Sequence, residues 1–252
     1  MTLNQIIRND ESSCEYMHLI SHIQAITLDL DDTLWPVAPT IAGAEQDLLE
    51  WLCVHSPQTA NLTRQIEVKK TIRQQVIAKY QDRLHDLGFL RREIIRESMR
   101  LAGDEPHLAD AAYAVFDAAR QRVTLFPGVE EALARLAAKY RLVAISNGTA
   151  DVFVTPAGPY FDAAFKAHEL GIAKPDARIY QAAITHLGLN PDQVLHVGDD
   201  ATADAWGASQ AGLQSVWVNP EGHPWTYESP KPWTVRHLSD VADHLLSDHL
   251  LS

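Results

Sequence analysis

The sequence predicts an α/β fold in which a three-layer, Rossmann-like parallel sheet carries an inserted all-helical domain. Three observations favour this fold. Beyond residue 127 the chain alternates strands with helices, between residues 36 and 123 only helical patterns occur, and several short apolar runs end in polar residues. Strands that alternate with helices at this spacing imply βαβ crossovers and a parallel sheet covered on both faces. The helical block is therefore an insertion into an α/β domain.

The chain begins with a segment of weak periodicity, residues 1–22, which we interpret as an N-terminal extension in which Met17 is an alternative start. The core domain is expected to comprise residues 23–37 and 120–252. Its first strand is an apolar run that ends in an acidic segment after Leu28. Helical spacing of apolar residues then covers residues 38–119, where about four helices are expected.

The second part of the core supplies the remaining elements. Helices are expected at about 128–139, 176–187 and 202–211, and strands at about 141–146, 163–167, 194–198 and 215–218. From Asn219 onward four prolines interrupt the pattern, so we expect a wrap that covers the sheet edge, with Trp225 and Trp233 as packing residues. A last helix is expected at about 239–249.

Composition limits the classes of function. The net charge of −12 over 252 residues argues against a nucleic-acid surface, because phosphates must be met by clustered Lys and Arg. Cys14 and Cys53 form neither a disulfide framework nor a zinc-binding pair, which favours a reducing compartment. No apolar run approaches the roughly 20 residues that span a membrane, and the start is too polar for a secretory signal. We expect a cytoplasmic monomer or homodimer with no membrane partner.

Polar residues follow four of the predicted strands or their connections. In an open parallel sheet, functional groups collect at the carboxyl edge, where the strands end. The four segments are Asp29-Leu30-Asp31-Asp32-Thr33, Ser146-Asn147-Gly148, Lys174-Pro175, and Gly198-Asp199 with Asp204 five residues further on. Taken singly, each is often a turn, a helix cap or a solvated lysine. Four such segments in this order indicate a functional site.

In sequence and order these segments resemble the haloacid dehalogenase superfamily, whose phosphatases carry D-x-D-x-T, a strand-end Ser or Thr, a Lys and G-D-x-x-x-x-D. The resemblance covers about residues 23–218 and implies that the helical insertion is a cap over the site. It further implies that Asp29 attacks phosphorus to form an aspartyl phosphate, and that Asp31 acts as general acid and base. Many relatives carry Gly where this chain has Asp32, which we expect to be a turn or surface carboxylate.

The resemblance also implies a cofactor and a substrate class. Mg²⁺ would bind Asp29, Asp199 and the backbone carbonyl of Asp31, since it favours oxygen ligands. The substrate would be a small phosphate ester. Asp204 would support the metal waters or the lysine. The residues implied to bind the phosphate group are Thr33, Ser146, Asn147 and Lys174.

The cap sequence bears on the substrate. Phe89, Arg91 and Arg92 lie at a helix junction, and the hypothesis is that they face the substrate, whereas the commoner role of such arginines is a solvated helix charge. Together with Trp35-Pro36, the cap pattern looks most like the branch of flavin mononucleotide and 5-amino-6-(5-phosphoribitylamino)uracil phosphatases of riboflavin metabolism.

Other interpretations stay open. A sugar phosphomutase of the same superfamily and a non-catalytic phosphate-binding or regulatory module are both alternatives. A haloacid dehalogenase is disfavoured because those relatives lack an acid at the position of Asp31. His18 and His22 are spaced by four residues but have no carboxylate nearby to complete a zinc motif. His196 is expected to be a packing residue within a strand.

Overall fold

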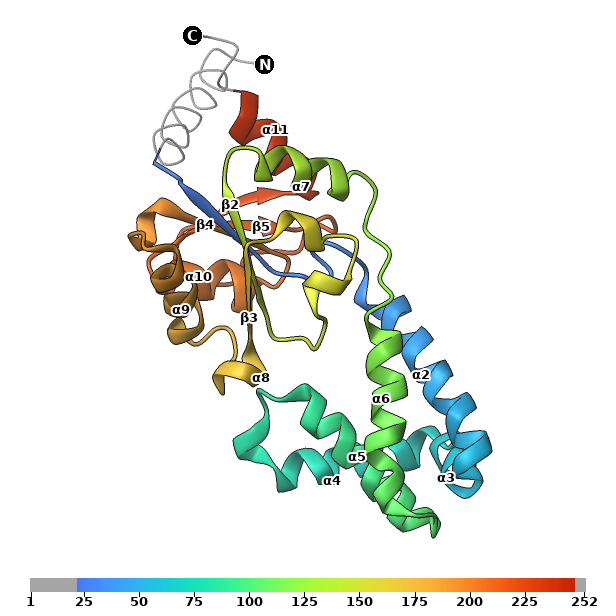
Figure 1. Cartoon of the computed structure of the whole chain (residues 1–252). Coiled ribbons are helices and arrows are strands. Elements are labelled where there is room, and N and C mark those ends of the chain that lie inside the picture. Colours follow the sequence, from blue (N-terminus) through green and yellow to red (C-terminus); the bar gives the residue numbers. More distant parts are fainter. Residues whose placement is uncertain (1–21, 248–252) are drawn as a thin grey trace.

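The computed structural model describes residues 22–247 and confirms the predicted fold class (Figure 1). Six parallel strands form one sheet in the order β3-β2-β1-β4-β5-β6. Their bounds are β1 Ala25–Leu28, β2 Arg141–Ser146, β3 Ala163–Lys166, β4 Val194–Gly198, β5 Gln214–Val218 and β6 Trp233–Val235. Strand β1 pairs with β2 on one side and β4 on the other, so its carboxyl end lies between theirs.

Helices cover both faces of the sheet (Figure 1). They are α7 Val129–Ala137, α8 Ala167–Leu170, α9 Ala177–Leu187, α10 Gly207–Gln210 and α11 Leu238–Ser247. Successive strand residues point to opposite faces. Ile26 and Leu28 pack in one core with residues of α7 and α11, whereas Ala25 packs in the second core with residues of α9 and α10. This burial on both faces explains why the strands are almost continuously apolar.

The helical insertion lies between β1 and β2 and extends away from the sheet (Figure 1). Its helices are α2 Val37–His55, α3 Pro57–Thr63, α4 Ile66–Lys79, α5 Leu87–Ala102 and α6 Ala109–Arg120. Leu48 of α2 and Phe116 of α6 belong to one buried cluster that holds these helices together. The two ends of the insertion meet, because the backbone N–H of Phe126 donates to the carbonyl of Leu34 at 2.9 Å.

A tight turn follows β1 and carries the acidic segment. The backbone N–H of Leu34 donates to the carbonyl of Leu30 at 2.8 Å. Asp32 has a φ of 56°, in the left-handed region that favours glycine. Its carboxylate accepts a hydrogen bond from the N–H of Val37 at 2.8 Å. Asp32 therefore closes the turn and steadies the start of α2.

The chain after Asn219 differs from the expectation in one respect. Residues 219–232 are irregular, but Trp233–Val235 form β6, which pairs in parallel with β5. We expected only a wrap here, because Pro230 and Pro232 argue against a strand. Trp233 packs on the core, and its ring centroid lies 4.8 Å from that of His244. The sheet thus gains an edge strand of three residues.

The predicted helix at 202–211 is also corrected. Residues Ala201–Trp206 form a π-helical turn, and the α-helix α10 begins only at Gly207. The carbonyl of Asp200 accepts from the N–H groups of Asp204 and Ala205, at 2.9 and 3.1 Å. Wide turns of this kind occur frequently at functional sites. The wide turn also lets the Asp204 carboxylate accept from the backbone N–H of Asp200 at 2.9 Å.

Some expectations concern residues outside 22–247. The N-terminal extension, with Cys14, Met17 and His18, lies outside the described residues apart from its last position. Cys53 is exposed and forms no disulfide. Among residues 22–247, no helix has the length and the apolar character that crossing a membrane requires.

Candidate active site

Three of the four predicted segments meet through one buried lysine. The ammonium of Lys174 donates to Asp29 at 2.5 Å and to Asp204 at 2.6 Å. Lys174 is 5% exposed, Asp29 8% and Asp204 1%. Buried charges persist only when they are paired and hydrogen-bonded, and this lysine joins a residue that follows β1 to one that follows β4. The carboxyl edge of the sheet therefore carries a buried ionic cluster.

Asp204 fits this cluster because Gly198 leaves room for it. A Cβ at Gly198 would lie 2.2 Å from the carboxyl carbon of Asp204, a distance that no side chain tolerates. The carboxylate therefore lies directly against the end of β4. Any larger residue at Gly198 would displace Asp204 from Lys174.

Asp29, Asp199 and Asp204 form a group of carboxylates that fits a metal ion. One oxygen of each lies within 4.8 Å of the others. Lys174 pairs with Asp29 and Asp204, whereas the Asp199 carboxylate accepts a hydrogen bond from the neutral hydroxyl of Thr33, so the group has more carboxylates than buried cations. Hard divalent cations prefer such oxygen ligands. The donor set and the charge of this edge both suit a divalent metal ion.

The electrostatics of the three carboxylates support that fit. Burial raises the pKa of Asp199 to about 7, and the charge of Asp204 adds to the rise. Burial also raises the pKa of Asp29 well above its usual value, against the opposing charge of Lys174. Burial would do the same to Asp204, but Lys174 and His196 outweigh it and lower the pKa of Asp204. A bound cation would favour the ionised form of Asp29 and Asp199.

His196 takes part in the polar network, which corrects the expectation of packing alone. Its ring is fully buried, with Nδ1 2.8 Å from the hydroxyl of Thr27 and Nε2 3.1 Å from the carboxylate of Asp204. Burial lowers the pKa of His196, so the neutral ring donates from Nε2 to Asp204 and accepts from Thr27 at Nδ1. Thr27 and His196 are register partners on adjacent strands. The sequence did carry one signal for this network, because Thr27 and His196 are polar residues within strands that are otherwise apolar.

Asp31 is not a member of the carboxylate group that fits a metal ion. Its carboxylate accepts from the indole N–H of Trp35 at 2.8 Å and from the guanidinium of Arg120 at 2.5 Å. Arg120 is the last residue of α6, and no pattern in the sequence singled it out. Gly148 makes room for the same carboxylate, because a Cβ there would lie 2.5 Å from Oδ2 of Asp31.

The predicted phosphate-binding residues all lie at this edge, where several support their neighbours. The hydroxyl of Ser146 accepts from the N–H of Gly148 at 2.9 Å, and the hydroxyl of Thr33 donates to Asp199 at 2.9 Å. The Asn147 side chain makes two bonds to the backbone of Lys174, at 2.8 and 3.0 Å. Asn147 thereby fixes the segment that carries the lysine.

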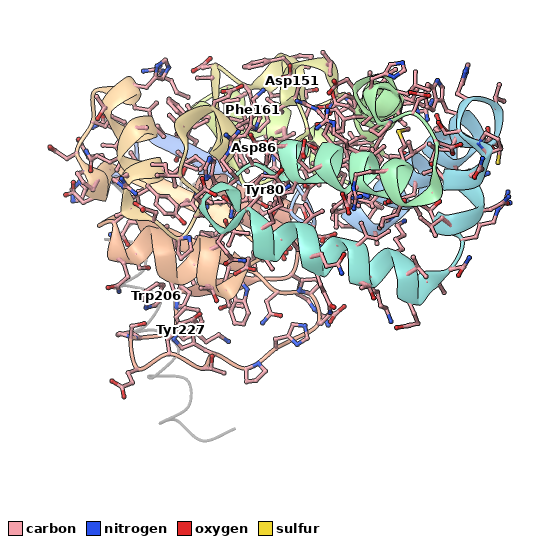
Figure 2. All side chains as sticks on the ribbon, turned by 90° about the horizontal axis from the view of Figure 1, so that it is seen from below. Tyr80, Asp86, Asp151, Phe161, Trp206 and Tyr227 are labelled. Carbon is pink, nitrogen blue, oxygen red and sulfur yellow. The ribbon has the colours of Figure 1, made fainter. Side chains whose placement is uncertain are left out.

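A cluster of aromatic side chains contacts the loop that carries Asp199. The indole N–H of Trp217 donates to the carbonyl of Asp199 at 2.8 Å. The Trp217 ring lies 5.6 Å from that of Trp225, which lies 4.8 Å from that of Tyr227. Figure 2 labels Tyr227 and Trp206, whose rings stack with centroids 5.4 Å apart. The irregular segment 219–232 is thus tied to the site-bearing loop by ring contacts.

Residues 23–212 match the family described as haloacid dehalogenase-like hydrolase. The chain belongs to this family. The resemblance drawn from the strand-end motifs is confirmed, and so is the prediction that the protein is an enzyme.

Relatives of this hydrolase include phosphatases. The chain is 33% identical over 206 residues to 5-amino-6-(5-phospho-D-ribitylamino)uracil phosphatase YigB of Escherichia coli, covering 80% of this chain and 86% of the relative. It is 30% identical over 169 residues to the phosphoserine phosphatase of Thermus thermophilus, covering 65% of this chain and 67% of the relative.

Solved structures share the fold of this hydrolase. A structure described as 2-haloacid dehalogenase from Pseudomonas syringae aligns with a TM-score of 0.82 and 34% identity, covering 89% of this chain and 99% of that one. The HAD-hydrolase YfnB of Bacillus subtilis, bound to magnesium, aligns with a TM-score of 0.65 and 19% identity, covering 89% of this chain and 99% of that one. At that identity the second likeness concerns the fold alone.

The cap residues singled out in the sequence form contacts within the cap of this hydrolase. Arg91 pairs with Glu45, and its guanidinium lies 4.2 Å from the ring centroid of Phe116. The guanidinium of Arg92 lies 4.8 Å from the ring centroid of Tyr113.

The third of these residues, Phe89, makes an edge contact with Tyr80 at 5.0 Å between centroids (Tyr80 is labelled in Figure 2). None of the contacts described for the three residues involves the carboxylate cluster. Arg91 alone of the three lines a cavity of about 330 Å³ between α2, α3, α4 and α5.

Proposed function

We propose that the protein is a magnesium-dependent phosphatase that hydrolyses a small phosphomonoester through an aspartyl-phosphate intermediate. One observation carries the proposal: the carboxylate of Asp29 lies 2.5 Å from the ammonium of Lys174, within a cluster that fits a divalent cation, while a second carboxylate, Asp31, is held two residues away. Phosphoryl transfer needs a nucleophile, cations that neutralise the phosphoryl oxygens, and a proton for the leaving oxygen. This edge of the sheet supplies the nucleophile and the proton donor. It also supplies one of the cations, the ammonium of Lys174.

The proposed reaction has two steps. A carboxylate oxygen of Asp29 bonds to phosphorus, the bond from phosphorus to the ester oxygen breaks, and Asp31 gives that oxygen its proton. Asp31 then takes a proton from water, whose oxygen attacks phosphorus and breaks the bond to Asp29. Inorganic phosphate and an alcohol are the products, and both carboxyl groups return to their starting states.

The chain's own residues would hold the phosphoryl group and the cofactor. Lys174 and the hydroxyl of Ser146 would contact the phosphoryl oxygens, with Thr33 and Asn147 supporting that contact. Asp29, Asp199 and the backbone carbonyl of Asp31 would bind Mg²⁺, and Asp204 would stay with Lys174. Bound Mg²⁺ would supply positive charge to the phosphoryl oxygens.

Asp31 also bears on the alternative of dehalogenation. Halide leaves as a stable anion and needs no proton, so the general-acid role of a carboxylate held by Trp35 and Arg120 would have no counterpart in the departure of halide. An alkoxide leaving group does need a proton. Asp31 therefore supports phosphate esters over haloacids as substrates.

For the substrate itself we propose flavin mononucleotide or a ribityl phosphate of riboflavin metabolism. The support is the relative named as acting on 5-amino-6-(5-phospho-D-ribitylamino)uracil, which shares 33% identity over most of both chains. Phe89, Arg91 and Arg92 remain the proposed specificity residues of the cap. The proposed compartment is the cytoplasm, where such esters are found.

A phosphate-release screen tests the proposal. Flavin mononucleotide, ribityl and sugar phosphates, nucleotides and phosphoserine are compared with and without Mg²⁺. We expect release that requires Mg²⁺ and stops in excess chelator. Release that persists in chelator would contradict the metal dependence, and conversion of a sugar phosphate to its isomer would favour a phosphomutase. Binding of phosphate analogues without turnover of any ester would favour a non-catalytic module.

The raised pKa of Asp199 leads to a prediction about the cofactor. Because burial and Asp204 raise the pKa of Asp199 to about 7, this residue must lose a proton before it binds a cation. Affinity for Mg²⁺ should therefore rise by about tenfold or more per pH unit through that pKa, because Asp29, whose pKa burial also raises, must be ionised as well. Isothermal titration between about pH 6 and pH 8, in buffers of different ionisation enthalpy, measures both the affinity and the released proton.

Thr33→Val provides the matched comparison. This variant removes the hydroxyl that donates to Asp199 and that lowers its pKa. The rise in Mg²⁺ affinity should move to higher pH in the variant. An affinity that is flat across the range in the wild-type protein would contradict the prediction.

A further inference from the structure

Arg120 is an arginine in an unusual place. It is the last residue of α6, the final helix of the cap, and only 2% of it is exposed. Arginine is almost never fully buried unless it is paired. Its partner is Asp31, 89 residues earlier in the chain, and one guanidinium nitrogen, Nη2, lies 2.5 Å from each carboxylate oxygen. The cap thus contributes a charged group to the proposed acid and base.

The Asp31 carboxylate is held from three sides. Arg120 contacts both oxygens, and the indole of Trp35 donates to Oδ1 at 2.8 Å. The backbone of Gly148 forms the third side, since a Cβ there would lie 2.5 Å from Oδ2 of Asp31 and 3.6 Å from Nη2 of Arg120. Rotation of the carboxylate about its Cβ–Cγ bond would break at least one of these contacts.

Stability alone does not account for Arg120. A buried ion pair is roughly neutral in free energy compared with apolar packing. The second terminal nitrogen of Arg120, Nη1, is buried and has no hydrogen-bond partner in the described structure, and a buried unpaired donor is destabilising. A group that is costly in the fold and directed at the proposed acid is better explained by its effect on that acid.

We infer that Arg120 is a positioning residue, which orients the Asp31 carboxylate toward the leaving oxygen and makes that orientation depend on the placement of the cap. The inference rests on the proposed function. The neighbouring residue shows how the end of α6 is fixed: the Gln121 side chain accepts from the N–H of Asp151 at 2.7 Å, in the loop that follows β2. A shift of α6 would carry Arg120 with it and would release Asp31.

The leaving group distinguishes this role from a merely structural one. An alkyl phosphate needs a proton on its departing oxygen, whereas p-nitrophenolate departs without one. The ratio kcat/KM covers the chemistry up to the departure of the alcohol and is independent of the later hydrolysis of the aspartyl phosphate. In Arg120→Lys and Arg120→Gln we expect kcat/KM to fall about 10²-fold for an alkyl phosphate and less than about 10-fold for p-nitrophenyl phosphate.

Two further variants complete the experiment. In an Asp31→Asn background, Arg120→Lys should cause no additional selective loss, because the group it positions is already gone. Arg122→Gln is the matched control: this arginine lies two residues further on, its side chain is 66% exposed, and it pairs with Asp47 at the surface. It should leave the preference between the two esters unchanged.

The outcomes separate the inference from the proposed function. An equal loss for both esters, or a gain in kcat/KM, would overturn the positioning role while leaving the phosphatase intact. A wild-type protein that releases phosphate from neither ester would contradict the proposed function and the inference with it. If the Arg120 variants do not fold, Trp35→Phe removes the indole N–H that donates to Asp31 while it keeps an aromatic ring in the core, and it should shift the preference in the same direction.

Discussion

The Asp29→Asn variant is expected to release phosphate at least about 10³-fold more slowly than the wild-type protein. The asparagine side chain has the same shape and can still accept the hydrogen bond from Lys174, which the wild-type carboxylate accepts at 2.5 Å. Its amide oxygen is not a nucleophile, so the covalent step is lost while the fold is retained. Steady-state phosphate release with the best substrate of the screen measures the effect.

The control for this variant is Asp162→Asn. Asp162 forms an exposed pair with Arg141 at 3.2 Å, so the same change of side chain occurs away from the carboxylate cluster. It should keep full activity. Mass spectrometry of acid-quenched wild-type protein should detect phosphate on the peptide that contains Asp29. Retention of near-wild-type release by Asp29→Asn would rule out the nucleophile assignment.

The Lys174→Met variant is expected to lose both activity and stability. Lys174 is the buried cation that pairs with Asp29 and Asp204, and methionine fills a similar volume without charge. Breaking a buried ion pair by removing one partner costs about 3–5 kcal/mol, because the other charge is left uncompensated. Urea denaturation in the presence of chelator measures the free energy of unfolding.

The pH dependence of that loss has a definite sign. Burial alone would raise the pKa of Asp204, but Lys174 and His196 hold it below its usual value. A lowered pKa contributes stability that is present above the unfolded pKa, about 4, and is lost as the pH falls through the folded pKa. The difference between Lys174→Met and wild type should therefore be largest near neutral pH and should shrink in acid.

Lys70→Met is the surface control for this experiment. Lys70 forms an exposed pair with Glu67 at 2.9 Å, and such pairs contribute less than about 1 kcal/mol. If Lys174→Met lowers the free energy of unfolding no more than Lys70→Met does, the proposed contribution of the buried ion pairs to stability is contradicted. Added Mg²⁺ should restore part of the stability of Lys174→Met, since the cation would neutralise the unpaired carboxylates.

The strand ends could be predicted because the change of residue type there is abrupt. Apolar β1 is followed at once by Asp29, and β4 ends at Gly198 just before Asp199. In a parallel sheet such ends meet at one edge, so proximity followed from order along the chain. The individual side-chain contacts could not be predicted from the sequence. That Thr33 donates to Asp199 and that Asn147 holds the backbone of Lys174 depends on side-chain geometry.

Other features of the structure are too short or too local to be detected from the periodicity of apolar residues. A π-helical turn adds one residue to a helical repeat, so the turn at 201–206 looks like ordinary helix in the sequence. Strand β6 has three residues and follows prolines. Arg120 is a single arginine at the end of an amphipathic helix, and its partner lies on a different element. Long-range pairs of single residues leave no local pattern.

The meeting of the two ends of the cap has a consequence for how such enzymes diversify. Because the N–H of Phe126 bonds to the carbonyl of Leu34, the core is already closed where the cap leaves it. The entropy of closing a loop grows only slowly with its length, so a longer, shorter or different insertion would leave the register of β1 and β2 unaffected. Proteins named as a ribitylamino-uracil phosphatase and a 2-haloacid dehalogenase both share about a third of their aligned residues with this chain. The segment between Leu34 and Phe126 is therefore one contiguous stretch of chain whose length and sequence can change with little effect on the sheet edge that carries the carboxylate cluster.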